Sequence, residues 1–265
     1  MPHRSWVSGA FRRRETRHEW TGPGDRRPRR WVTQAGLAGA LELDLLCGFC
    51  ERAVAAGLPI RRAQIVIDTL HPVHEGRVFR WRCDRAGEVL EYGRTSESDA
   101  TADKWLQSPF NHLLKTGAST LRRKLDNQGP AEFPILADLK AEGQTEYLAS
   151  VQRFAGEGVI GEMDCVYSSW TSDAPAGFSD SDADTLFRLL PPLALAVKCA
   201  SLARIAGTLV ETYLGRHAGR RVLDGVIARG VAERIRAVVW FSDLQGFTRI
   251  TDTADPGDII PVLND

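Results

Sequence analysis

The hydrophobic and polar positions between residues 38 and 213 follow two different periods. Apolar side chains recur every three or four residues over 38–56 and over about 182–213, which predicts two amphipathic helices. Shorter stretches alternate residue by residue, a pattern typical of strands that bury one face. We expect strands at 64–68, 78–83, 88–92, 119–125, 146–154 and 159–170, and short helices at 108–115 and 134–143.

Local signals support the helix boundaries. Ser108 followed by Pro109 is a typical helix start, and Gly143 follows the last turn of the helix expected from residue 134. Serine and aspartate residues between 178 and 184 provide N-capping groups for the long helix. Two consecutive prolines, Pro191 and Pro192, predict a kink within that helix.

The order of these elements predicts an α+β domain with a mostly antiparallel sheet. The segments 137–148 and 176–180, together with the strand pair around Gly158, resemble the GAF family of sensory domains over roughly residues 35–213. The resemblance implies an antiparallel sheet flanked by helices, a long C-terminal linker helix, and a small ligand held between sheet and helices. A PAS-like sensor has a similar order of elements and stays an alternative.

The GAF resemblance also implies a ligand pocket lined by aromatic and small polar side chains. His112 is the polar group that we single out, although a histidine beside Phe110 and Leu113 is more often an ordinary core or surface residue. No attachment motif for haem, flavin or bilin is evident, so the expected ligand is an unknown small molecule. The candidate lining residues are Trp81, Trp105, Phe110, His112, Tyr147 and Cys165.

Near the end of the sequence, an apolar run at 237–241 precedes Asp243, a glycine turn and a helix-like segment. A strand at 237–241 would place the Asp243 carboxylate at the end of a sheet, beside backbone N–H groups suited to phosphate. The string from Val238 to Thr248 and the segment 256–265 resemble the start of the catalytic domain of class III nucleotidyl cyclases, a ferredoxin-like α/β fold.

The cyclase resemblance implies roles for particular residues. Asp243 and the backbone carbonyl of Leu244 would bind Mg²⁺ or Mn²⁺, and the segment Gln245, Gly246, Phe247 and Thr248 would approach the phosphates of ATP. The family's second metal aspartate and purine-reading residues lie further downstream, and this sequence ends at Asp265. We therefore expect the sensory and regulatory part of an adenylate cyclase, inactive by itself. The alternative is a stand-alone GAF-like module that binds a small molecule or dimerises.

These resemblances divide the chain into four parts. A disordered tail is expected over 1–34, a GAF-like sensory domain over 35–213, a linker over 214–235, and the incomplete cyclase domain over 236–265. Apolar positions along the long helix form an approximate stripe that predicts pairing with a second copy of the chain, and therefore a homodimer. The stripe consists of Leu193, Val197, Ala200, Ile205, Leu209 and Leu214.

Composition adds limits on location and partners. The formal net charge is zero, so no overall field favours nucleic acid or a membrane, and neither partner is expected. The tail is unusual, with nine arginines against three acidic residues between Met1 and Trp31, a composition typical of disorder. No uninterrupted run of about 20 apolar residues predicts a membrane span. Five cysteines without a signal peptide indicate a reducing, cytoplasmic location, with Cys47 and Cys50 expected as buried hydrophobes.

Overall fold

The computed structural model describes residues 28–93, 104–125, 132–154, 161, 163–228, 236, 238–255, 257, 259 and 263. The chain divides into two compact units, 1–225 and 226–265. Within the first unit, most of the predicted strands and helices are found close to their expected positions.

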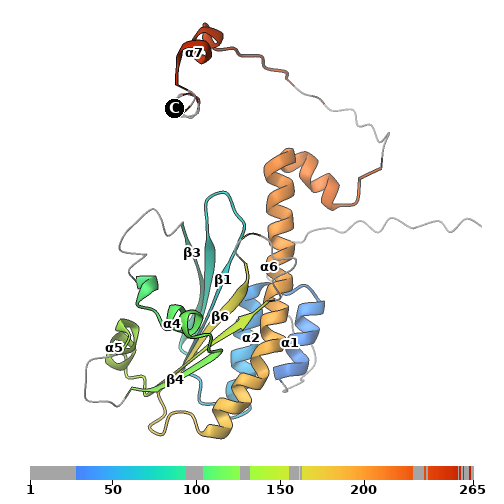
Figure 1. Ribbon diagram of the computed structural model, residues 1–265. Helices are drawn as coiled ribbons and strands as arrows, with labels where there is room; N and C mark the ends of the chain where they lie inside the picture. Colours follow the sequence, from blue (N-terminus) through green and yellow to red (C-terminus); the bar gives the residue numbers. More distant parts are fainter. Residues whose placement is uncertain are drawn as a thin grey trace, which may run out of the picture. The chain divides into compact units, whose positions relative to one another are not determined.

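The first unit is built on a six-stranded antiparallel sheet in the order β3-β2-β1-β6-β5-β4 (Figure 1). The outer hairpin joins β2 to β3 through a turn at Cys83 and Asp84, so β3 begins three residues before the strand expected at 88–92. The predicted α+β class with an antiparallel sheet is therefore confirmed. The strands are β1 (Arg62–Asp68), β2 (Gly76–Arg82), β3 (Arg85–Tyr92), β4 (Thr120–Lys124), β5 (Glu146–Arg153) and β6 (Cys165–Ser172).

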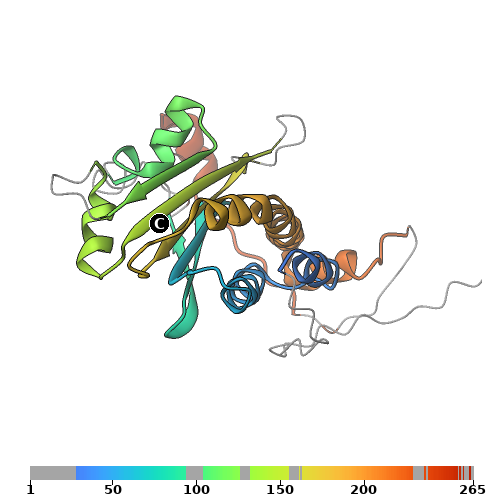
Figure 2. The ribbon, with the colours of Figure 1, turned by 90° about the horizontal axis from the view of Figure 1, so that it is seen from below.

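Helices cover the two faces of the sheet differently. Figure 2 shows α1 (Pro28–Leu37), α2 (Glu42–Ala55) and α6 (Asp180–Leu223) together on one face, and α4 (Pro109–Thr116) and α5 (Pro134–Ala141) on the other. The face beneath α1, α2 and α6 holds the larger apolar core. Burying these side chains is the main favourable contribution to folding of this unit. Its fully buried members include Phe49, Ile65, Trp170 and Leu186.

Helix α1 corrects the predicted tail. Residues 28–34 were expected to be disordered, but they belong to α1, whose Trp31, Val32 and Ala35 are buried. The Trp31 ring lies against Gly48 of α2 and under the guanidinium of Arg52, 4.2 Å from the ring centroid. The arginine-rich composition hid this helix, because three apolar side chains at helical spacing anchor it by tertiary contacts. Residues 1–27 of the predicted tail lie outside the described residues.

The long helix α6 begins with a capping box between Ser179 and Asp182, as the sequence indicated. Helix α6 runs through Pro191 and Pro192, where a kink was predicted, without non-helical backbone angles; within α6, only Gly215 has such angles, with φ of 73°. Proline keeps a helical φ although it loses a backbone donor, whereas glycine adopts positive φ without a steric penalty. The helix breaks at Gly215 and then continues to Leu223, so the part of the predicted linker from 216 to 223 is helical.

The predicted dimer stripe on α6 faces inward. Leu193, Val197 and Ile205 are at most 1% exposed and belong to the core beneath the sheet, while Ala200 and Leu209 pack against the edge of that core. Five of the six stripe residues therefore pack on their own domain. The sixth, Leu214, is 50% exposed, and α6 also leaves Leu195 and Tyr213 to solvent.

By length and composition alone, α6 is apolar enough to cross a membrane. The same test is passed by core helices of soluble proteins, and a third of its most apolar window is buried in this domain. The apolar character of α6 is therefore accounted for in part by its packing against the sheet.

The second unit contains one described helix, α7 (Phe247–Thr253), which follows Gly246 at φ of 78°. The predicted turn and helix are therefore present. The predicted strand is not: residues 238–241 form no strand and are 70–94% exposed, and Ala237 lies outside the described residues. A single extended segment is stable only when it pairs with neighbours, and the described part of this unit provides none. The start of a cyclase fold is thus not seen.

Candidate ligand-binding pocket

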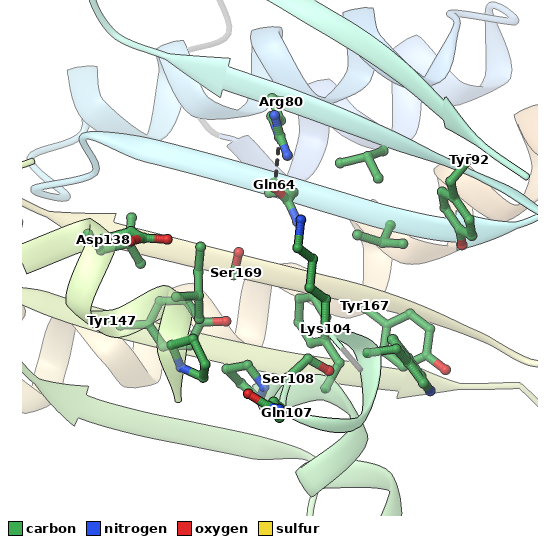
Figure 3. A pocket seen from close by; sticks show the side chains of 18 of the residues that line it. Gln64, Arg80, Tyr92, Lys104, Gln107, Ser108, Asp138, Tyr147, Tyr167 and Ser169 are labelled. Carbon is green, nitrogen blue, oxygen red and sulfur yellow. Dashed lines mark hydrogen bonds between the residues drawn. The ribbon is translucent and has the colours of Figure 1, made fainter. Parts of the chain in front are cut away.

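A cavity of about 1110 Å³ lies on the sheet face away from α6 (Figure 3). The sheet forms its floor, and α5 together with the segment 104–110 forms the opposite wall. This volume is slightly above the usual range of small-molecule sites, which is about 300–1,000 Å³. Five strands, β1, β2, β3, β5 and β6, contribute lining residues. The opposite wall contributes residues between Lys104 and Phe110 and, from α5, Pro134, Ile135, Asp138 and Leu139.

The floor changes its chemistry along β1 because alternate residues of a strand face the same side. Arg62, Gln64, Val66 and Asp68 all line the cavity, so the floor passes from a cation, through an amide and an apolar side chain, to a carboxylate. Successive members of this series are about 7 Å apart along the strand. The cavity is therefore elongated and chemically different at its two ends.

Aromatic rings form the apolar middle of the cavity. Tyr167 of β6 lies edge-on to Trp105, with ring centroids 5.5 Å apart, and is tilted against Phe110 at 5.3 Å. Val66 and Val78 lie next to them on the floor. Burial raises the pKa of Tyr167 far above its ordinary value, so its hydroxyl stays neutral at physiological pH. These groups suit a flat apolar molecule.

The end near Gln64 is rich in hydrogen-bond donors. Arg80 of β2 donates from Nε to Oε1 of Gln64 at 3.0 Å, and its Nη1 pairs with Glu88 at 3.3 Å. Lys104 extends from the opposite wall in the direction of Gln64 (Figure 3). The Gln64 amide is oriented by the arginine, because its carbonyl oxygen must face the donor.

Arg62 and Arg82 share one carboxylate, Glu142 at the end of α5, at 3.3 and 2.8 Å. Burial lowers the pKa of Arg62, and the neighbouring charge of Arg82 lowers it further, although an arginine remains charged at physiological pH. The pairs hold the end of α5 against the sheet. Tyr147 and Ser169 complete this end of the floor, and burial raises the pKa of Tyr147.

The other end of the cavity is acidic. Tyr92 of β3 donates its hydroxyl to Asp68 at 2.5 Å. Burial, together with the adjacent Asp68 carboxylate, raises the pKa of Tyr92 well above its ordinary range, so the phenol remains a donor. Glu75 and Asp164 also line this end.

The structure brings together some of the predicted pocket residues. Phe110, Tyr147 and Trp105 line the cavity. Trp81 does not: it alternates with Arg80 along β2 and lies in the core beneath α2 and α6. A strand places neighbouring residues on opposite faces, so the prediction chose the wrong face of β2.

The other two predicted residues lie close to the cavity without lining it. His112 on α4 faces a second cavity of about 410 Å³, where its ring is edge-on to Phe133 at 5.5 Å. Cys165 shares the face of Tyr167 but is 1% exposed in the surrounding cluster, and burial raises its pKa.

Sequence reasoning missed the polar part of the cavity: Gln64, Arg80, Lys104 and Ser169. The prediction concentrated on aromatic residues and histidine. A visible signal was the alternation of polar with apolar residues along β1, in which the polar set cannot belong to the core face. Lys104 carried no such signal, because its place depends on how the segment before α4 crosses the sheet.

The predicted metal and phosphate residues lie in the second unit. Asp243 and Leu244 are in an exposed irregular segment, Gln245 and Gly246 form a turn, and Phe247 and Thr248 begin α7. Among the residues that the structure describes, no three or more histidine, cysteine, aspartate or glutamate side chains form a group able to hold a metal ion. The described residues around Asp243 therefore do not make a metal site by themselves.

No protein-family model matches the chain, and none of the curated proteins matches it. The cyclase resemblance therefore rests on residues 238–248 and 256–265 alone.

Solved structures match part of the chain. One is the GAF domain of a two-component sensor histidine kinase from Bacillus halodurans, at 14% identity over 58% of this chain and 94% of that chain, with a TM-score of 0.38. A second is the phycoerythrobilin-bound GAF domain of a cyanobacterial phytochrome, at 12% identity over 66% and 95%, with a TM-score of 0.40. A third is the N-acylhomoserine lactone dependent LuxR family transcription factor CepR2 from Burkholderia cenocepacia, at 9% identity over 68% and 96%, with a TM-score of 0.42. At these values we transfer no function from them.

Proposed function

We propose that the first unit is a sensory module that binds a small molecule in the cavity between β1, β2, β5, β6 and the segments 104–110 and 134–141. The observation that carries this proposal is the cavity itself, which combines an aromatic middle with a few polar groups at its ends. Sites for small molecules have this composition, whereas an ordinary packing defect is smaller and uniformly apolar.

The fold offers a route from the cavity to the rest of the chain. Each strand of the floor presents one set of side chains to the cavity and the other set to the layer of α1, α2 and α6. On β1, Gln64 and Val66 line the cavity while Ala63 and Ile65 lie in the core that packs against those helices. We propose that ligand binding shifts the equilibrium between two packings of α6 on the sheet, which changes the segment beyond Gly215.

A thermal-melt screen of a metabolite library with the full chain tests the binding proposal. Two variants fill the cavity from opposite walls: Ser169→Trp from the sheet and Asp138→Trp from α5, where the side chain is exposed and the substitution should not disturb folding. Ligands of the cavity should raise the melting temperature of the wild type and fail to raise that of either variant. If every stabilising compound acts equally on the wild type and on both variants, the cavity is not the ligand site.

We also propose, as the finer reading, that the sensory module regulates an adenylate cyclase. The string from Val238 to Thr248 supports it, with Asp243 as a metal ligand for Mg²⁺ or Mn²⁺ and ATP as the substrate of a complete catalytic domain. The test is an immunoblot of cell extract with antibody to this chain, followed by a cyclase assay of the immunoprecipitate. A product well above 29.3 kDa that makes cyclic AMP, with the activity lost in Asp243→Asn, supports the proposal. Absence of activity from such a larger product contradicts it.

We propose a homodimer separately, now through Leu214, the exposed end of the predicted stripe, and its neighbour Tyr213. Tyr213 is 83% exposed and Leu214 50% exposed just before the break at Gly215, so two neighbouring large apolar side chains face solvent there. Light scattering of the full chain at micromolar concentration should give twice the monomer mass, and Tyr213→Glu should reduce it to that of the monomer. A wild-type monomer would contradict the proposal.

A further inference from the structure

We infer that the cavity selects a molecule with an anionic group attached to a flat apolar body; this rests on the proposed ligand site. At one end of the cavity, the fold leaves hydrogen-bond donors unused. The expected ligand is therefore an amphipathic carboxylate, sulfonate or phosphate rather than an uncharged molecule.

Lys104 brings to this end of the cavity a positive charge that the fold does not use. Its side chain lines the cavity and extends in the direction of Gln64 (Figure 3), and within the described residues its ammonium group has no hydrogen bond or ion pair. The other cations at this end are already paired, Arg80 with Glu88 and Arg62 with Glu142. A lysine whose charge is not used by the fold is available for an anion from outside.

Gln64 brings an NH₂ group to the same end of the cavity. Its carbonyl oxygen is taken by Nε of Arg80, so its NH₂ group is the part of the amide left for a ligand. Gln64 and Lys104 come from opposite walls, and both present N–H donors to this part of the cavity. A ligand group at this position must therefore accept hydrogen bonds, and charge-assisted bonds to an anion are the stronger kind.

The apolar middle of the cavity determines the chemistry of the rest of the ligand, its flat apolar body. Val66 follows Gln64 by two residues, about 7 Å along the floor, so a ring attached to an anion at Gln64 would lie above Val66. Tyr167 and Phe110 enclose that position with their rings. Asp138 also lines the cavity and, like Lys104, is exposed to solvent, but it lies on the side of Tyr147, away from Lys104 (Figure 3).

Two dyes that share one apolar body test the inference. 8-Anilinonaphthalene-1-sulfonate and N-phenyl-1-naphthylamine differ only by the sulfonate, and both gain fluorescence in apolar sites. Titration of the full chain should give a dissociation constant about tenfold lower for the sulfonate dye, a difference of roughly 1.4 kcal/mol. Lys104→Met should remove this preference by weakening the sulfonate dye about tenfold while changing the neutral dye less than twofold. Lys124→Met, an exposed lysine outside the cavity, should change neither.

Equal affinity of the two dyes, or a Lys104→Met variant that weakens both equally, would overturn the anionic selectivity while leaving the ligand site in place. Failure of the site itself gives a different result. Both dyes would then bind Ser169→Trp and Asp138→Trp as tightly as the wild type.

Discussion

Replacing Arg204 by methionine should destabilise the first unit strongly, because it would leave a buried carboxylate without its cation. Glu42 of α2 is 1% exposed, and Arg204 of α6 donates to both of its oxygens, at 3.1 Å from Nε and 2.6 Å from Nη2. The hydroxyl of Ser201 adds a third contact at 3.1 Å. Removing one partner of a buried pair typically costs about 3–5 kcal/mol.

Replacing the other partner of the pair, Glu42, should destabilise the first unit less. In Glu42→Gln the amide keeps the shape of the side chain and one acceptor for Arg204, whose side chain is 34% exposed and can also reach water. We expect a loss of about 1–2 kcal/mol. The double variant Glu42→Gln with Arg204→Met should be more stable than Arg204→Met alone, because no buried charge remains.

The pH dependence gives a second check on the same pair. Burial raises the pKa of Glu42, but the hydrogen bond and charge of Arg204 outweigh burial and hold the pKa below its ordinary value. In the wild type, this carboxylate therefore stabilises the fold at pH values above the ordinary glutamate pKa. That stabilisation is lost as the pH falls through the lowered pKa of Glu42. In Arg204→Met the pKa should lie above the ordinary value, so acid should relieve the destabilisation.

Urea unfolding of the full chain at pH 7 and at pH 5, monitored by circular dichroism, measures the loss of stability in Arg204→Met and its dependence on pH. A loss of about 3–5 kcal/mol corresponds to a fall in melting temperature of roughly 6–20 °C for a domain of this size. The difference between wild type and Arg204→Met should shrink at pH 5. A variant within about 1 kcal/mol of the wild type at pH 7, or a penalty independent of pH, would refute the reasoning.

Three further changes test other parts of the fold. Trp31→Ala should cost about 3–5 kcal/mol in a thermal melt if α1 belongs to the core, and a loss under about 1 kcal/mol would remove α1 from it. Gly48→Ala should cost about 1–3 kcal/mol although alanine favours helices, because its Cβ would lie 2.1 Å from the Trp31 ring; in a Trp31→Ala background it should instead be neutral or stabilising in the same melt. In thiol titration with Ellman's reagent, exposed Cys83 and Cys199 should react in the native protein, while Cys50, whose pKa is raised by burial, should react only in urea; rapid native labelling of Cys50 would contradict its burial.

The sequence predicted the elements of the first unit better than their orientation. Strands such as β1 and β5 and the start of α6 carried local signals, a period-two pattern or a capping box, that do not depend on distant residues. Trp81 shows the limit of such signals, because choosing the face of a strand requires knowing which side the long helix covers. The helix α1 was missed because its stability comes from contacts of Trp31 with α2 rather than from its composition.

The candidate site was predicted only in its aromatic part. Phe110 and Tyr147 were identified as large side chains of the expected pocket, and both line it. Lys104 could not be placed from sequence, since its position depends on the path of the chain before α4. The strand predicted at 237–241 rested on local apolar character, which is not sufficient without neighbouring strands to pair with.

The most direct test of the ligand site is hydrogen–deuterium exchange of the full chain, measured with and without saturating 8-anilinonaphthalene-1-sulfonate. Binding in the cavity should slow exchange in the segments 104–116 and 132–141, which form its outer wall, and leave α1 and α2 unchanged. Slower exchange confined to α1 and α2, or no slowing in any segment, would contradict the assignment of this cavity as the ligand site.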